Sequence, residues 1–156
     1  MRHSSLFALI LLVAPGAAFG LDDDAKAVAV AKETLDKGAA LFDKRDAAAM
    51  AATYIETAQV IVIKRASDTD RVVTEIRSGR AEIEKAYAEI FKDRLPEHKS
   101  RNTVESARLL SPDMLLIQGR FSLNIDQGDS IRFVQIRTRE GDQWKVVTMQ
   151  LMEMPK

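Results

Sequence analysis

Apolar residues recur at helical spacing in the N-terminal part of the chain. Over residues 25–43 they return every three or four positions between charged side chains, and this pattern predicts a long amphipathic helix. A short alanine-rich helix is expected after Asp46, whose carboxylate can cap its first turn. A third helix should open at Ser78-Gly79 and stop at Leu95-Pro96. Its predicted buried stripe consists of Ile83, Ala86, Tyr87, Ile90 and Phe91.

The remaining segments have the pattern of β-strands. A dense β-branched run predicts a first strand over residues 58–64, and residues 72–76 predict a second strand that can pair with it across a polar loop. After Pro96 the pattern predicts an antiparallel meander separated by turns that contain Gly or Pro. Its strands are expected over residues 101–110, 114–126, 131–139 and 144–152.

This order of elements predicts an α+β fold in which helices pack on one face of a strongly bent antiparallel sheet. Gly119 lies in mid-strand, so we expect it to mark a bend or bulge. Gly38 lies inside the first helix and leaves two alternatives, a close approach of another backbone element or a tolerated glycine. With no repeat or linker, one domain over residues 21–156 is expected.

The first 20 residues predict a secretory signal peptide. The basic start Arg2-His3 precedes an apolar run over residues 6–13 and the small-residue exit Ala18-Phe19-Gly20. The run is too short to span a bilayer and acidic residues follow it, which disfavours a retained anchor. Cleavage after Gly20, or alternatively after Ala18, would release a protein to the periplasm or the exterior, with no membrane partner thereafter.

Charge and cysteine content exclude several classes of function. The 156 residues carry 23 basic and 23 acidic side chains whose signs alternate, so nothing favours a nucleic-acid partner. The absence of cysteine excludes disulfides, thiol catalysis and thiolate metal sites. His98 is the only histidine after the signal peptide, and no metal-spaced cluster or phosphate-binding glycine loop is present. We therefore expect no metal site and no cofactor.

Three segments in this order resemble a known superfamily. They are Asp46 to Tyr54 leading into the first strand, Ser78-Gly79-Arg80-Ala81-Glu82-Ile83 opening the third helix, and the terminal Trp144-Lys145-Val146-Val147. Together they span nearly the whole chain after the signal peptide and resemble the nuclear transport factor 2-like superfamily, whose conical fold is shared with ketosteroid isomerase and SnoaL-like polyketide cyclases. The chain is most similar to small exported members with a SnoaL-like or DUF4440-like domain. The resemblance implies a cone open at one end to a ligand, and a homodimer formed through the sheet.

The resemblance does not extend to the catalytic groups of ketosteroid isomerase. That enzyme uses a carboxylate base on the first strand, with a tyrosine and a protonated carboxylic acid as the oxyanion hole. Here Val62 stands at the base position, Val134 is nearest the place of the second acid, and the first helix has no tyrosine. We therefore assign no catalytic residue.

Several residues are candidates for binding a ligand in the cone. The resemblance implies that one face of the last strand lines the interior of the cone. That face would carry Trp144, Val146, Thr148, Gln150 and Met152. An arginine at position 132 can bind an anion through two hydrogen bonds. The candidate ligand-binding residues are Tyr54, Val62, Tyr87, Arg132, Thr148 and Gln150.

The polar and aromatic candidates each have a structural alternative. Tyr54 can be a packing residue that locks the second helix onto the sheet, and Tyr87 can belong to the core. Arg132 can lie at the sheet rim with a solvated head. Thr148 and Gln150 can be bonded to neighbouring groups.

Three functions stay open at this point. The first is non-catalytic binding of a small apolar ligand in the cone, favoured because the interior strands carry apolar residues and no acid–base pair. The second is an isomerase- or cyclase-like enzyme with a non-standard site in the same cavity. The third is a protein–protein interaction module that uses the other face of the strand over residues 114–126. That face mixes polar and apolar side chains: Met114, Leu116, Gln118, Arg120, Ser122 and Asn124.

Overall fold

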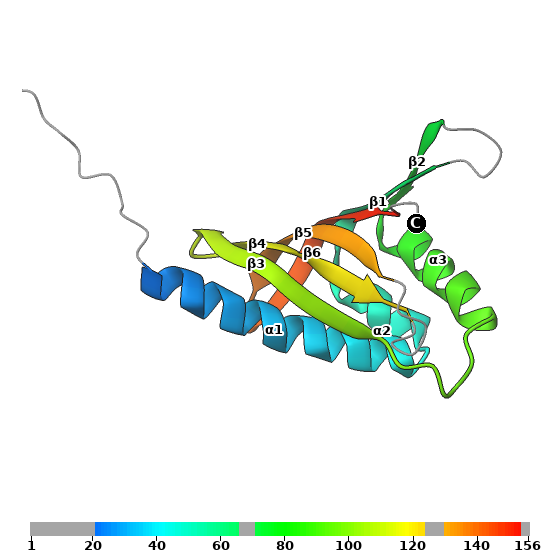
Figure 1. The fold of residues 1–156 in the computed structure, drawn as a ribbon, viewed down its shortest axis with the longest axis horizontal. Helices are drawn as coiled ribbons and strands as arrows, with labels where there is room; N and C mark the ends of the chain where they lie inside the picture. Colours follow the sequence, from blue (N-terminus) through cyan, green and yellow to red (C-terminus); the bar gives the residue numbers. More distant parts are fainter. Residues whose placement is uncertain (1–20, 66–70, 124–129, 154–156) are drawn as a thin grey trace, which may run out of the picture.

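The computed structural model describes residues 21–65, 71–123 and 130–153. These residues form an α+β fold of helices on one strongly curved sheet, as predicted (Figure 1). The elements in chain order are α1 (Leu21–Asp43), α2 (Ala47–Ala52), β1 (Tyr54–Arg65), β2 (Val72–Ser78), α3 (Arg80–Lys92), β3 (Arg101–Ser111), β4 (Met114–Ser122), β5 (Ile131–Glu140) and β6 (Gln143–Met152). The predicted signal peptide, most of the loop after β1, and the predicted strand end and turn over residues 124–129 lie outside the described residues.

The sheet contains one parallel pair that the pattern did not predict. Its strand order is β2-β1-β6-β5-β4-β3. The meander β3 to β6 and the pair β1–β2 are antiparallel, whereas β1 and β6 run parallel and place Val60 opposite Met149. This pair joins the N-terminal half of the chain to the C-terminal meander. In Figure 1, α1 runs beside β3 at one edge of the sheet and α3 lies near β1 and β2 at the other.

All three helices bury side chains against the concave face of the sheet. The small residues Ala27 and Ala31 let α1 approach β3 closely and belong to a buried cluster that also contains Leu115 of β4, while Phe42, at the other end of α1, contacts α3. On α3 the predicted stripe buries Ile83, Tyr87 and Phe91, but Ile90 is 46% exposed. The prediction for Ile90 is therefore wrong as far as burial is concerned, because the helix reaches the sheet only along the narrower line of its other residues.

A β-bulge reverses the two faces of β6 halfway along the strand. Arg137 on β5 pairs with Val146, whereas the preceding Ile136 pairs with Thr148, so Val147 is an extra residue on β6. Since side chains alternate across a strand, one extra residue sends every later side chain to the opposite face. Trp144 and Val146 face the interior, and beyond the bulge Met149 and Leu151 do so. The prediction that Thr148, Gln150 and Met152 share the inner face of Trp144 is therefore wrong.

Gly119 lies beside another bulge, as its mid-strand position predicts. It pairs with Val104, and the register of β3 then shifts between Val104 and Ser106. A Cβ atom at Gly119 would lie 2.3 Å from the carbonyl oxygen of Thr103 and 2.9 Å from Cζ of Phe133. The glycine thus allows a close approach of β3 and of a core ring. At Gly38, by contrast, a Cβ atom would meet nothing within 4 Å, so no backbone element approaches it.

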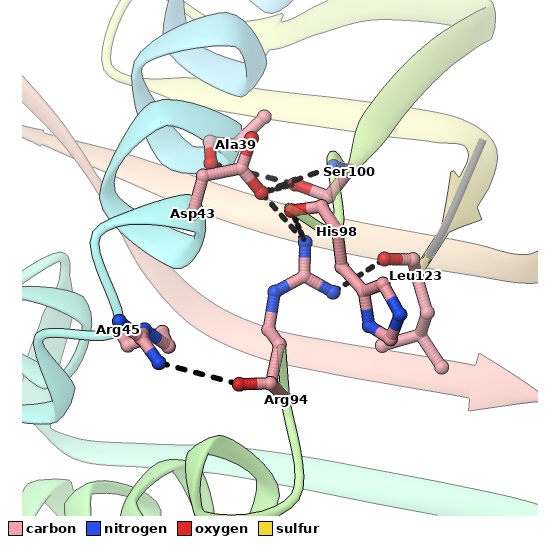
Figure 2. Close-up of polar contacts among 7 residues, drawn as sticks. All are labelled: Ala39, Asp43, Arg45, Arg94, His98, Ser100 and Leu123. Carbon is pink, nitrogen blue, oxygen red and sulfur yellow. Dashed lines mark hydrogen bonds and ion pairs between the residues drawn. The ribbon is translucent and has the colours of Figure 1, made fainter. Parts of the chain in front are cut away.

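A buried arginine ties the ends of three segments together (Figure 2). Nη2 of Arg94 donates to Oδ1 of Asp43 at the end of α1, 2.7 Å away, and to the carbonyl oxygen of His98 at 2.9 Å. Its Nη1 donates to the carbonyl oxygen of Leu123 just beyond β4. The same Asp43 oxygen accepts from N and Oγ of Ser100 at the start of the meander, at 3.0 and 2.8 Å. The guanidinium also lies 4.7 Å from the ring centroid of Phe42, within cation–π range. We call these contacts of Arg94 with Asp43, His98 and Leu123 the Arg94 clamp. His98 takes part in it only through its backbone carbonyl group.

Two alanine substitutions at glycines should have opposite effects. Gly119→Ala is expected to lower the free energy of unfolding by about 2 kcal/mol, because backbone or a core ring must shift to admit the methyl group. Gly38→Ala is expected to raise the free energy of unfolding by about 0.5–1 kcal/mol, because alanine has a higher helix propensity than glycine and nothing obstructs its methyl group. Urea unfolding of both variants measures these changes, and a stable Gly119→Ala variant would contradict the close approach described here.

Removal of the Asp43 carboxylate should weaken the Arg94 clamp strongly. Asp43→Ala leaves a guanidinium whose side chain is 5% exposed without its anion, so we expect the free energy of unfolding to fall by about 3 kcal/mol. Lys37→Ala is the matched control, because it breaks the exposed pair with Glu33 and should cost less than about 0.5 kcal/mol. Equal losses in urea unfolding would show that the clamp contributes no more than a surface ion pair.

Candidate functional site

A cavity of about 770 Å³ lies between the concave face of the sheet and the helices. Its wall includes side chains from all three helices and from β1, β3, β4, β5 and β6. Most of the enclosed wall is apolar and includes Leu41, Phe42, Val62, Phe121, Ile131, Phe133, Val146 and Leu151. Cavities of roughly 300–1,000 Å³ with such walls are typical of small-molecule sites.

The structure brings half of the predicted ligand-binding residues to this cavity. Tyr54 and Val62 of β1 and Tyr87 of α3 line it. Arg132, Thr148 and Gln150 do not line it. The bulge in β6 turns Thr148 and Gln150 to the outer face of the sheet, where Gln150 lies opposite Val134.

Arg132 is placed by the alternation of side chains along β5. Phe133, Gln135 and Arg137 are buried on the inner side, at 2%, 6% and 5% exposure. Arg132 is therefore exposed on the outer face, on the same side as Val134. That face points away from the cavity, so the predicted interior position of Arg132 is wrong.

Sequence reasoning missed Gln135, Arg137 and Met149, which also line the cavity. In β5 the apolar Val134 and Ile136 alternate with Gln135 and Arg137, and this pattern favours burial of the wrong face. The contrary signals were Ile131 and Phe133, two apolar residues that lie on the same face of β5 as the two polar ones.

These residues form a polar cluster with Tyr54 and Tyr87. The two tyrosine hydroxyls are 2.6 Å apart, and the Tyr54 hydroxyl also donates to Sδ of Met149 at 3.8 Å. Nε2 of Gln135 donates to the same sulfur at 3.2 Å. Nε of Arg137 donates to Oε1 of Gln135, and its Nη1 donates to the carbonyl oxygen of Trp144, both at 2.9 Å. We call Tyr54, Tyr87, Gln135, Arg137 and Met149 the polar cluster.

The titratable members of the polar cluster have their ordinary protonation states at neutral pH, although burial shifts their pKa values. It raises the pKa of the Tyr54 hydroxyl well above its usual value, and the neighbouring Tyr87 adds to this effect. Burial likewise raises the pKa of Tyr87. It lowers the pKa of Arg137 to about 10, so the guanidinium is still charged at neutral pH. The cluster therefore offers hydrogen-bond donors and one positive charge, and none of its groups titrates near pH 7.

The described part of the chain offers the cavity little chemistry beyond this cluster. The lining carboxylates belong to the exposed residues Glu33, Asp142 and Glu153. Within the described ranges, no three His, Asp or Glu side chains are grouped so that they could hold a metal ion. No helix in these ranges is both long and apolar enough to cross a membrane.

Comparison with known proteins identifies the fold. No family model matches the sequence, and no curated protein matches it. A nuclear transport factor 2-like protein of unknown function from Shewanella oneidensis superimposes with a TM-score of 0.62 at 16% identity, over 83% of this chain and 98% of that one. A domain of unknown function with a cystatin-like fold from Nostoc punctiforme gives a TM-score of 0.61 at 14% identity, over 84% and 79% of the two chains.

A third similar structure is named after an enzyme. The ketosteroid isomerase-like protein from Erwinia carotovora atroseptica gives a TM-score of 0.53 at 13% identity, over 80% of this chain and 97% of that one. At such identities the likeness concerns the fold alone. The narrower resemblance to exported SnoaL-like members stays a prediction from the sequence. The chain has the nuclear transport factor 2-like α+β cone fold.

Proposed function

We propose that this protein binds a small, largely apolar molecule in the cavity and does not transform it. The observation that carries the proposal is the cavity itself, about 770 Å³ in volume with a mostly apolar wall. Three aromatic side chains of this wall pack edge to face, since the ring of Phe42 lies 6.2 Å from that of Tyr87 and 5.0 Å from that of Phe121. Such packing favours a wall that keeps its shape around a ligand.

The absence of catalysis is supported by the position of Val62. This residue lines the cavity at the place where the resemblance to ketosteroid isomerase expects a carboxylate base. The other groups of the interior are tyrosines held neutral by burial and a charged arginine. None of them can accept a proton readily at neutral pH.

Blocking the cavity should abolish binding of a neutral apolar probe. N-phenyl-1-naphthylamine is such a probe, and its fluorescence rises in apolar surroundings. Val62→Phe adds bulk on the cavity side of β1 and should weaken binding of this probe about tenfold or more. Ile63→Phe is the matched control, because this side chain, next to Val62, points to the opposite face of the same strand and should leave binding unchanged.

Fluorescence titration of the two variants decides between the outcomes. Equal probe binding by the Val62→Phe variant and the unmodified protein would place any bound probe outside the cavity. Failure of the unmodified protein to bind the probe would overturn the proposed function. Trp144, the only tryptophan of the chain, lines the cavity and provides an independent fluorescence signal.

A second proposal concerns the convex face of the sheet, through which we propose that the protein forms a homodimer. Four side chains lie there on the adjacent strands β1, β6 and β5: Ile61, Gln150, Val134 and Ile136. None of them belongs to the core clusters formed with the helices. They are only half-buried, by their own neighbours in the sheet. A mixed apolar and polar face of this kind is typical of an interface between subunits.

The dimer proposal predicts the mass of the particle in solution. Sedimentation equilibrium should give twice the mass of the chain, and Val134→Lys should reduce it to that of a monomer by placing a charge in the interface. Lys32→Met, on the exposed side of α1, is the control and should leave the dimer intact. A monomeric unmodified protein would contradict the proposal.

A further inference from the structure

The polar cluster contains more strong hydrogen-bond donors than strong acceptors. Both Tyr54 and Gln135 donate to Sδ of Met149, and a thioether sulfur is only a weak acceptor. The one amide oxygen of the cluster, Oε1 of Gln135, already accepts from Nε of Arg137. A ligand oxygen that reached the cluster would therefore be a better partner for two of its donors than the sulfur that they now contact.

One nitrogen of the Arg137 guanidinium donates no hydrogen bond to the described residues. Of its three nitrogens, Nε and Nη1 donate to Gln135 and to the carbonyl oxygen of Trp144. Nη2 has no partner among the described residues. Within the same residues, only Nε of Arg94 is both sealed from solvent and without a hydrogen bond. Nη2 of Arg137 must therefore border open space, and the space that this residue lines is the cavity.

The positive charge of Arg137 also lacks a counterion. The residue is 5% exposed, yet no carboxylate in the described ranges forms an ion pair with it. The only titratable groups that influence its pKa electrostatically are the hydroxyls of Tyr54 and Tyr87. Arg94, the other arginine buried to this degree, is paired with Asp43 at 2.7 Å. A buried, unpaired cation is costly, and this cost is recovered when an anion binds to it.

On these observations, and resting on the proposed function, we infer that the ligand is amphiphilic, with an apolar body in the cavity and a carboxylate head bound by Nη2 of Arg137. The hydroxyl of Tyr54 and the amide of Gln135 then turn from the Met149 sulfur to the carboxylate oxygens. A carboxylate suits this site because it accepts several charge-assisted hydrogen bonds in one plane. The mostly apolar wall selects the body, and the polar cluster selects the head.

The test compares two ligands that differ only in the head group. Decanoate and decanol compete with N-phenyl-1-naphthylamine, already bound to the purified protein, in a fluorescence displacement titration. Decanoate should compete about tenfold better than decanol, since a hydrogen bond to a charged group is stronger than one between neutral groups. In Arg137→Met the advantage of decanoate should disappear, while the affinity for decanol should stay within about threefold.

Two further variants test whether Arg137 itself, with Tyr54, binds the carboxylate. Arg132→Met removes the same charge from the opposite face of the same strand, so decanoate should keep its full advantage if Arg137 itself binds the carboxylate. Tyr54→Phe removes a single donor and should reduce the advantage by a few fold. This milder variant carries the test if Arg137→Met does not fold.

The outcomes separate the inference from the proposed function. If the probe binds but decanoate and decanol displace it equally well, the cavity binds apolar molecules and the carboxylate inference is wrong. Retention of the advantage in both Arg137→Met and Tyr54→Phe would also overturn it. If the probe does not bind at all, the proposed function fails and the inference fails with it.

Discussion

The parallel pairing of β1 with β6 joins two halves of the chain that are far apart in sequence. It places Val60 opposite Met149, and the backbone amide of Val146 donates to the carbonyl oxygen of Thr53 at 2.9 Å. Without this pairing, Tyr54 and the α3 residue Tyr87 would not meet the side chains of β5 and β6. The cavity, its polar cluster and the edge strand β2 therefore all depend on these main-chain hydrogen bonds.

The polar cluster and the Arg94 clamp show two uses of a buried guanidinium. Arg94 is paired with a carboxylate and bonded to two carbonyl groups, so its charge fastens α1 to the start and the far end of the β3–β4 hairpin. Arg137 is bonded to neutral groups only and borders the cavity. An unpaired buried charge weakens the folded state, and proteins retain such groups mainly where function needs them. This difference makes Arg137, rather than Arg94, the functional candidate.

Most elements follow from local patterns in the sequence. The residue types at helical spacing predict α1 and α3, Asp46 caps α2 as expected by accepting from the amide of Ala49, and the turns separate the strands of the meander. Leu115 and Ile117 are fully buried, as the alternation along β4 predicts. Tyr54, Val62 and Tyr87 line the cavity because each belongs to an element whose inner face the pattern or the resemblance identified correctly.

The sequence by itself therefore determined the fold class and the order of the elements, because these depend on local periodicity and turn chemistry. The conical scaffold was implied by the resemblance to a known superfamily. Only the tertiary structure decided which face of β5 and β6 lines the cavity. The extra residue Val147 exchanges the faces of β6, and burial of Phe133 takes Gln135 and Arg137 inward with it. The bulge arises where β6 pairs with β5, and its one extra residue reverses every later side chain without a mark on the local pattern. The inward face of β5 is decided by the packing of Phe133 into the core that includes α1.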